Sequence, residues 1–460
     1  MNLSAKKVVL IIVSIGSFLT PFMASSINIA LPTIDMEFNM EAVLLSWVAT
    51  SYLLSSAIFI VPFGKIGDIV GRKKIYIYGI LTFTLSSLGC ALSFSTTLLI
   101  FFRIIQGIGS AMLFGTGIAM LTSAYEANER GKAIGINTAS IYIGLTAGPV
   151  IGGLLTNVFG WRSIFIINIP LGIIVLLLIK YLLKEEWSLE YKKFDYYGSF
   201  LYVTMLLMVI YGLSILPDYT GVLIIIMGIT LSVFFIRWEL KAKEPILNVL
   251  LFKNNRKFAI SNFAAFITHS ATFAVGFLIS LYLQYIKGFN AGETGIILLF
   301  QPIVMVLFSI VAGRLSDKIE SYILSSIGML IISVSLIVFS FIREDTSILY
   351  IIICLIVLGI GMAIFAPPNV HAIMSSVERK FYGISSAMVG TMKITGQMIS
   401  MAIATLVIGL YIGNVQIAPQ NYLLFIQGEK VIFTVYSILC LGGFFSLLIK
   451  GREPMEGSKV

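Results

Sequence analysis

Long apolar runs that carry almost no charge recur from one end of the 460-residue chain to the other. An α-helix needs about 20 apolar residues to cross the hydrocarbon core of a membrane, whereas a β-strand needs about 10 of alternating character. Because these runs are continuous, we predict helices, whose backbone polar groups are satisfied internally. Only 12% of the residues are charged, about half the share of a soluble domain. The sequence therefore predicts an all-α polytopic membrane protein and excludes a soluble enzyme, a disordered protein and a single-anchor receptor.

Fourteen runs are long enough to span a membrane. We place the spans at 8–31, 43–63, 75–95, 97–121, 132–156, 164–183, 196–216, 220–238, 258–286, 294–313, 321–341, 347–370, 384–412 and 430–449. The first run resembles a signal peptide, but its length and the interruption by Pro21 favour a span that is retained.

The distribution of basic residues supports this count. With the N-terminus inside, 25 of the 31 Lys and Arg residues fall in cytoplasmic segments, and only Arg103 and Lys393 fall within spans. A missed helix would invert every later loop and destroy this asymmetry. We therefore expect a multi-pass protein of the cell membrane with both termini in the cytoplasm. The net charge of +9 does not indicate nucleic-acid binding, because no basic run is interleaved with aromatic residues in a soluble segment.

Two cytoplasmic segments recur at the same spacing. Gly64-Lys65-Ile66-Gly67-Asp68 and Gly313-Arg314-Leu315-Ser316-Asp317 lie 249 residues apart, as do Glu129-Arg130 and Glu378-Arg379. The repeat predicts two six-helix bundles, at 1–190 and 251–460, separated by two inserted helices within 191–250. Paired bundles are an architecture of secondary transporters, whose substrate site lies near the membrane midplane.

The first of these segments continues through Gly71-Arg72-Lys73-Lys74 and resembles the signature loop of the major facilitator superfamily. Its glycines allow tight turns and close helix approach, and arginine can clamp a carboxylate. We expect a cytoplasmic latch that stabilises one access state; the alternative is a basic loop that only fixes orientation. The predicted latch residues are Gly64, Asp68, Gly71, Arg72, Gly313 and Asp317.

The fifth predicted span resembles the antiporter signature of the same superfamily. Its motif residues are Gly135, Gly144, Gly148, Pro149, Gly152 and Gly153. The glycines spaced four apart share one helix face and permit close contact between helices in lipid, so the alternative is a packing seam without a role in coupling. Further segments, among them Asn28-Ile29-Ala30-Leu31-Pro32, resemble the 14-span drug:proton antiporter branch.

Polar residues within the spans are the candidates for coupling and for lining a cavity. The coupling candidates are Arg103, His269 and Lys393, and the cavity candidates are Asn28, Gln106, Asn137, Asn262, Gln301 and Gln397. Arg103 lies in a segment that resembles the fourth-span motif of the superfamily, and a mid-membrane arginine usually faces a pathway. His269 has an imidazole, whose ordinary pKa is near neutrality. For the amides and the histidine, hydrogen-bonded packing is the alternative.

The sequence departs from that branch in its acidic residues. Where the branch carries an acid in the first span, this chain has Met23, and we expect all 22 acidic residues in loops or at span ends, with Asp35, Glu37 and Glu41 in the first external loop. A cavity with two cations and no carboxylate is expected to favour neutral or anionic cargo.

The leading prediction is a monomeric secondary transporter that exports small amphiphilic compounds by alternating access, with protons as the coupling ion. The resemblance implies a cavity lined by spans one, four, nine and twelve. Uptake or facilitated diffusion of a neutral or anionic metabolite is the alternative, and a membrane sensor that has lost transport is a minor one. No enzyme motif is present, no cofactor or metal is expected, and the Phe, Ile and Met side chains are assigned no role in a site.

Overall fold

The computed structural model describes residues 5–126, 129–183, 194–216, 218–247, 249–315, 319–378, 382–413 and 415–450. All regular secondary structure in these ranges is helical. Fourteen helical segments are long and apolar enough to cross a membrane. The predicted all-α polytopic fold and the number of spans are therefore confirmed.

The helices follow one another with short connections. Their bounds are α1 Ala5–Phe38, α2 Ala42–Val70, α3 Arg72–Ala91, α4 Thr96–Ala124, α5 Arg130–Phe159, α6 Ser163–Ile166, α7 Asn168–Leu182, α8 Tyr196–Ser214, α9 Tyr219–Glu239, α10 Val249–Asn254, α11 Arg256–Leu281, the π-helix η1 Tyr282–Ile286, α12 Ala291–Leu298, α13 Phe300–Leu315, α14 Ser321–Phe339, α15 Ile348–Ser375, α16 Tyr382–Tyr411, the 3₁₀ helix η3 Pro419–Asn421 and α17 Tyr422–Lys450.

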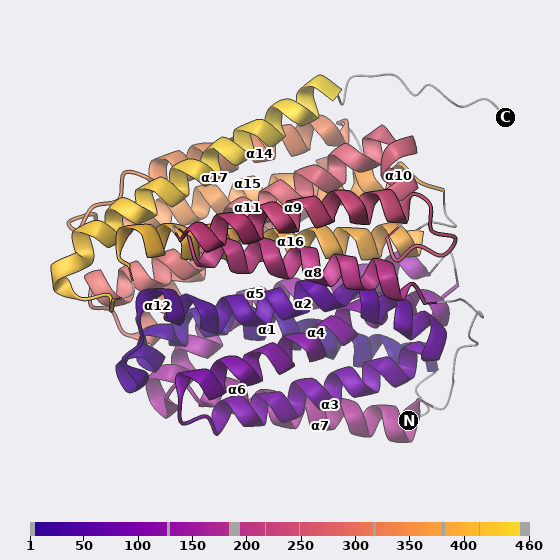
Figure 1. The fold of residues 1–460 in the computed structure, drawn as a ribbon, viewed down its shortest axis with the longest axis horizontal. Helices are drawn as coiled ribbons and strands as arrows, with labels where there is room; N and C mark the ends of the chain where they lie inside the picture. Colours follow the sequence, from indigo (N-terminus) through magenta and orange to yellow (C-terminus); the bar gives the residue numbers. More distant parts are fainter. Residues whose placement is uncertain are drawn as a thin grey trace.

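These helices form two six-span bundles with equivalent internal contacts. In the first bundle α1 packs on α5, and α4 packs on α2 and α3; in the second, α11 packs on α16, and α15 packs on α13 and α14. Figure 1 shows the first bundle in indigo and purple on one side and the second in orange and yellow on the other. The inserted helices α8 and α9 pack on each other, and α8 also contacts α2 and α16.

Several span ends differ from those predicted, most of all the ends of α1 and α2 and the beginning of α17; α2 ends at Val70 rather than at residue 63. Helix α1 continues through Pro32 to Phe38, so Asp35 and Glu37 lie in its last turn rather than in the first external loop. The Asp35 side chain accepts a hydrogen bond from the backbone N–H of Met40, which terminates the helix in a buried setting. The last span begins at Pro419 rather than at residue 430, because an apolar stretch on each side of Glu429 outweighs its charge.

The two ends of the molecule differ in how the bundles meet. We call the end of the molecule at which α1 begins and α17 ends the terminal end; it lies on the right in Figure 1. The opposite end carries α12. At this opposite end Ser280 Oγ donates to the carbonyl oxygen of Asn28 at 2.9 Å, and Gln284 Nε2 donates to that of Ile29 at 3.1 Å. The Tyr285 hydroxyl also donates to the Asp35 carboxylate. The bundles are thus joined by hydrogen bonds away from the terminal end.

Candidate functional site

A cavity of about 400 Å³ lies between the two bundles. It is lined by residues of α1 and α5 from the first bundle and of α11, α12, α13, α15 and α16 from the second. The predicted lining by spans one, nine and twelve agrees with α1, α11 and α15. Span four, which is α4, does not line this cavity, but its Ser110, Phe114 and Ile118 line the smaller cavity that adjoins it. Spans five, ten and thirteen do line the larger cavity, because α5, α12–α13 and α16 make the contacts across the interface.

A second cavity, of about 160 Å³, extends toward the terminal end. Its lining reaches Ile134 in the first turns of α5 and Met374 in the last turn of α15. The residues common to both linings are Tyr142, Leu145, His269, Phe365, Ala366, Lys393 and Gln397. They form the boundary between the central cavity and the space that leads to the terminal end, and we call them the constriction.

Two of the three coupling candidates meet at the constriction. His269 comes from α11 and Lys393 from α16, and these helices approach closely at Gly396. A Cβ added to Gly396 would lie 2.7 Å from the carbonyl oxygen of Phe266 and 2.9 Å from Cβ of His269. The Lys393 ammonium lies 5.7 Å from the centre of the Tyr142 ring, within cation–π range. The close helix contact therefore brings both basic side chains to one wall of the cavity.

The third coupling candidate, Arg103, lines neither cavity. It is fully buried inside the first bundle, where its Nε donates to the carbonyl oxygen of Val48 at 2.9 Å and its Nη1 to Gln106 Oε1 at 2.6 Å. Its guanidinium also lies over the Tyr52 ring. These contacts join α4 to α2, which supports a structural role; the coupling role stays a prediction.

The six cavity candidates divide evenly. Asn28, Gln301 and Gln397 line the central cavity. Gln106 instead donates to Ser87 Oγ and accepts from Arg103 within the first bundle. Asn137 and Asn262 are buried but belong to neither lining. Sequence position alone does not show which face of a helix meets the other bundle, and that face decides the outcome.

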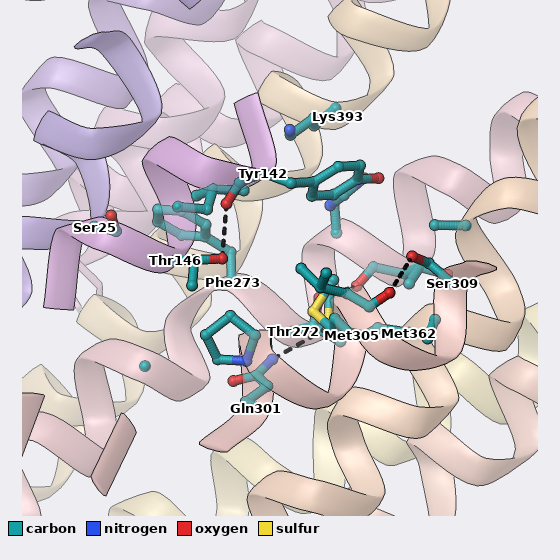
Figure 2. Close-up of a pocket in the computed structure, with 18 of the residues that line it drawn as sticks. Ser25, Tyr142, Thr146, Thr272, Phe273, Gln301, Met305, Ser309, Met362 and Lys393 are labelled. Atoms are coloured by element: carbon teal, nitrogen blue, oxygen red, sulfur yellow. Dashed lines mark hydrogen bonds between the residues drawn. The ribbon is translucent and has the colours of Figure 1, made fainter. Parts of the chain in front are cut away.

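Several lining residues were not among the predicted ones. Met305, Met362 and Phe273 line the cavity, so the expectation that Met and Phe side chains have no place in a site is wrong for these three. Figure 2 shows Met305, Met362 and Gln301 on one side of the cavity and Lys393 and Tyr142 on the other. Gln301 Nε2 contacts Met362 Sδ at 3.2 Å. Apolar residues dominate most ligand pockets, but nothing in the sequence separates them from residues facing lipid.

One acidic residue contradicts the expected distribution. Glu429 lies within the last span rather than at its end, and it is only 1% exposed. Neither of its carboxylate oxygens has a hydrogen-bond partner among the described residues. It lines neither cavity, however, and none of the described lining residues is Asp or Glu. The predicted absence of a carboxylate therefore agrees with the described lining, but only one of the two predicted cations, Lys393, lies there, because Arg103 is buried inside the first bundle.

The glycines of the antiporter-type motif make two helix contacts. A Cβ at Gly144, Gly148 or Gly152 would lie 2.5, 1.9 or 2.6 Å from atoms of α1, so this face of α5 needs glycine. Gly153 faces the other bundle instead, where a Cβ would lie 2.5 Å from the carbonyl oxygen of Ala291 in α12. Pro149 lines the cavity. Gly135 makes no close helix contact, since a Cβ added there would meet nothing within 4 Å. The packing role of this seam is thus visible at each close glycine.

The predicted latch is a set of contacts within the first bundle. Arg72 pairs with Asp68 at 2.7 Å and donates to the carbonyl oxygen of Ala119 and to Ser123 Oγ at the end of α4. Gly71 has a φ of 120°, which favours glycine at the turn between α2 and α3. Gly64 packs on Gly115.

The equivalent positions of the second bundle, Gly313 and Asp317, show fewer latch contacts among the described residues. Gly313 ends the tenth span, where an added Cβ would meet no heavy atom within 4 Å, and Asp317 lies outside the described residues. A latch that responds to the access state stays a prediction.

The molecule consists of two helical bundles with a central cavity between them and hydrogen bonds that join them at one end. This architecture is that of secondary membrane transporters. The family model of the Major Facilitator Superfamily matches residues 13–236 and 261–459, and the chain belongs to this superfamily. The resemblance seen in its motifs is therefore confirmed, and the chain is a transporter of small molecules rather than an enzyme.

The chain is similar to two curated transporters over most of its length. It is 34% identical to the riboflavin transporter RibZ of Clostridioides difficile, over 84% of this chain and 85% of that one. It is 30% identical to the multidrug resistance protein Stp of Mycobacterium tuberculosis, over 86% and 74%. A solved structure of similar fold is a bacterial homologue of the human lysosomal transporter Spinster, inward-facing and unoccupied, with a TM-score of 0.71, 15% identity and 98% coverage of both chains.

Proposed function

We propose that the chain is a proton-driven exporter that carries small amphiphilic compounds, neutral or anionic, by alternating access. The observation that carries the proposal is the lining of the central cavity. Met305, Met362 and Phe273 provide apolar surface, Lys393 provides a positive charge, and the described lining contains no carboxylate. A cationic compound would lose its hydration beside Lys393 and gain no counter-charge, which is unfavourable at low dielectric.

The direction of transport is proposed from the relatives and the motif. The similarity to a multidrug resistance protein supports export, and the glycine seam of α5 resembles the antiporter signature. His269 is the proposed proton carrier, because it is the imidazole at the constriction and is positioned to exchange protons with either cavity. The location in the cell membrane with cytoplasmic termini is proposed from the charge asymmetry of the loops.

Transport by purified protein in proteoliposomes tests this function. An imposed proton gradient is expected to drive a neutral amphiphilic dye against its concentration gradient, and the substrate is expected to collapse that gradient in return. Robust transport of a permanently cationic quaternary ammonium dye, in preference to the neutral one, would contradict the proposed cargo. Transport that is unaffected by a protonophore would contradict proton coupling.

A second candidate is uptake or facilitated diffusion of a neutral or anionic metabolite. It is supported by the 34% identity to a riboflavin transporter and by a cavity lining without the carboxylate that cation:proton exchange normally uses. Riboflavin accumulation in cells that require it distinguishes the two. Growth that depends on the chain, at low external riboflavin and without need of a proton gradient, would favour this candidate over export.

A further inference from the structure

Lys393 lies in a membrane span and has no acidic partner among the described residues. No described residue in either lining is Asp or Glu. A lysine inside a membrane is costly and usually pairs with another group or marks a substrate pathway. Since the described lining residues supply no anion, a bound ligand is the counter-charge that fits this position.

The groups beside Lys393 are suited to hold an anion. Gln397 follows one helical turn later on α16, and His269 and Tyr142 face the same constriction from α11 and α5. Neither Lys393 nor the side chains of these three form hydrogen bonds to the described residues. An amide, a phenol and an imidazole can each donate to a carboxylate, so several donors are free around one cation.

The opposite side of the cavity carries two methionines beside Gln301. Met305 and Met362 lie across the cavity from Lys393 in Figure 2, on α13 and α15. Methionine side chains adapt to irregular and aromatic surfaces. The cavity therefore has a positively charged side at the constriction and an adaptable side with two methionines, a distribution that matches a molecule with one acidic end and one apolar body.

We propose that Lys393 and Gln397 form an anion subsite, and that the compounds carried are amphiphilic monoanions. Their carboxylate binds at the constriction, and their aromatic or aliphatic body lies against Met305 and Met362. This inference rests on the proposed function, since it takes the central cavity as the substrate site. It narrows the cargo from neutral or anionic compounds to those with one carboxylate.

Binding of three matched probes to the purified, detergent-solubilised full chain tests the subsite. The probes are 1-naphthaleneacetate, its uncharged primary amide and 2-(1-naphthyl)ethylammonium, which share one fluorescent ring system. The carboxylate is expected to bind about tenfold or more tightly than the amide, as charge-assisted hydrogen bonds generally allow, and the ammonium is expected to bind weakest. Equal binding of acid and amide, or no saturable binding of the acid, would overturn the proposal.

Variants separate the subsite from the fold. K393M removes the charge at similar length and is expected to weaken acid binding about tenfold while leaving amide binding within about twofold. K393R is expected to restore most of the affinity for the acid. K180M removes an exposed lysine of α7 away from both cavities and is the matched control.

The two proposals fail in different ways. If K393M binds the acid as tightly as the parent chain, or loses acid and amide equally, the subsite is wrong. Proton-driven transport of the amide, measured in proteoliposomes of the same protein, then reports on the proposed function alone. Loss of acid selectivity with intact amide transport would leave the exporter and remove the subsite.

Discussion

At the scale of single residues, the surroundings of a charge decide what it does. Arg103 and Lys393 look alike in the sequence, since each is a basic residue inside an apolar run. In the fold, Arg103 is fully buried and donates to Val48 and Gln106. Lys393 lines the cavity and pairs with no acidic residue in the part of the chain that the structure describes. Arg103 thus gives two of its donors to protein acceptors inside one bundle, although its Nη2 has no hydrogen-bond partner among the described residues. Lys393 instead lies where a ligand can reach it.

Replacement of Arg103 by methionine is expected to weaken the first bundle. It removes hydrogen bonds from a charged donor and leaves Gln106 Oε1 without that partner, at a cost of about 1–3 kcal/mol. The apparent unfolding temperature of the purified protein should fall, and substrate affinity should not change. Unchanged thermal stability combined with lost proton coupling would contradict the structural role and restore the coupling role.

His269→Gln tests the proposed proton carrier. An imidazole ordinarily titrates between pH 5 and 8, and a glutamine does not. We expect the pH dependence of transport to flatten in His269→Gln, measured as initial rates in proteoliposomes. His371→Gln is the control, because His371 lies outside both cavities and contacts Ser321. If both variants keep the parent pH profile, His269 does not carry the proton.

At the scale of elements, one helix serves two interfaces. Helix α5 uses Gly144, Gly148 and Gly152 to approach α1 and Gly153 to approach α12 across the bundles. Gly295 of α12 allows the same close contact from the second bundle, since a Cβ added there would lie 2.3 Å from the carbonyl oxygen of Pro149 in α5. The three glycines that face α1 hold α5 within its own bundle. Gly153 and Gly295 instead lie at the contact between the bundles, which must break if the bundles rock apart.

Gly153→Ala is therefore expected to loosen the joined end of the molecule. The added methyl group would crowd the carbonyl oxygen of Ala291, and overpacking of this kind costs about 1–3 kcal/mol, roughly a tenfold change in population for each 1.4 kcal/mol. Labelling of Ser46→Cys, which is buried at that end, by a thiol reagent should accelerate in purified protein. Gly135→Ala, with open space around it, should leave the labelling rate unchanged, and equal acceleration in both would contradict the assignment.

At the scale of the whole molecule, the bundles are joined at the end opposite the termini. Thr405 Oγ1 of α16 donates to Ser46 Oγ of α2 at 2.9 Å, and the backbone N–H of Ala42 donates to the carbonyl oxygen of Val415. The smaller cavity leads from the constriction toward the terminal end. Under the proposed alternating-access mechanism, this arrangement would be one of the two access states.

A disulfide between Ser46→Cys and Thr405→Cys is expected to lock this state. The three native cysteines, Cys90, Cys354 and Cys440, are buried, so oxidation should act on the introduced pair. Transport by proteoliposomes should stop on oxidation and return on reduction, while each single variant remains active. Full transport by the oxidised double variant, with the disulfide verified by mass spectrometry, would contradict alternating access through this interface.

The sequence by itself determined the number of spans, the two-bundle fold and the superfamily, because apolar run length, loop charge and short glycine motifs are local signals. The same signals misplaced the end of α1 and the beginning of α17, and with the latter Glu429, because both helices continue past the charged residues near which the prediction ends or begins the span. The boundaries of the three segments proposed from the repeat, 1–190, 191–250 and 251–460, remain predictions.

The tertiary structure decided which residues form the cavity. His269, Lys393, Asn28, Gln301 and Gln397 were predicted and line it, whereas Arg103, Gln106, Asn137 and Asn262 do not. Met305 and Met362 line it and were not predicted. In a membrane span, lipid-facing, packed and cavity-facing positions all accept apolar residues. Which of them a given side chain occupies depends on how the helix is rotated against helices hundreds of residues away.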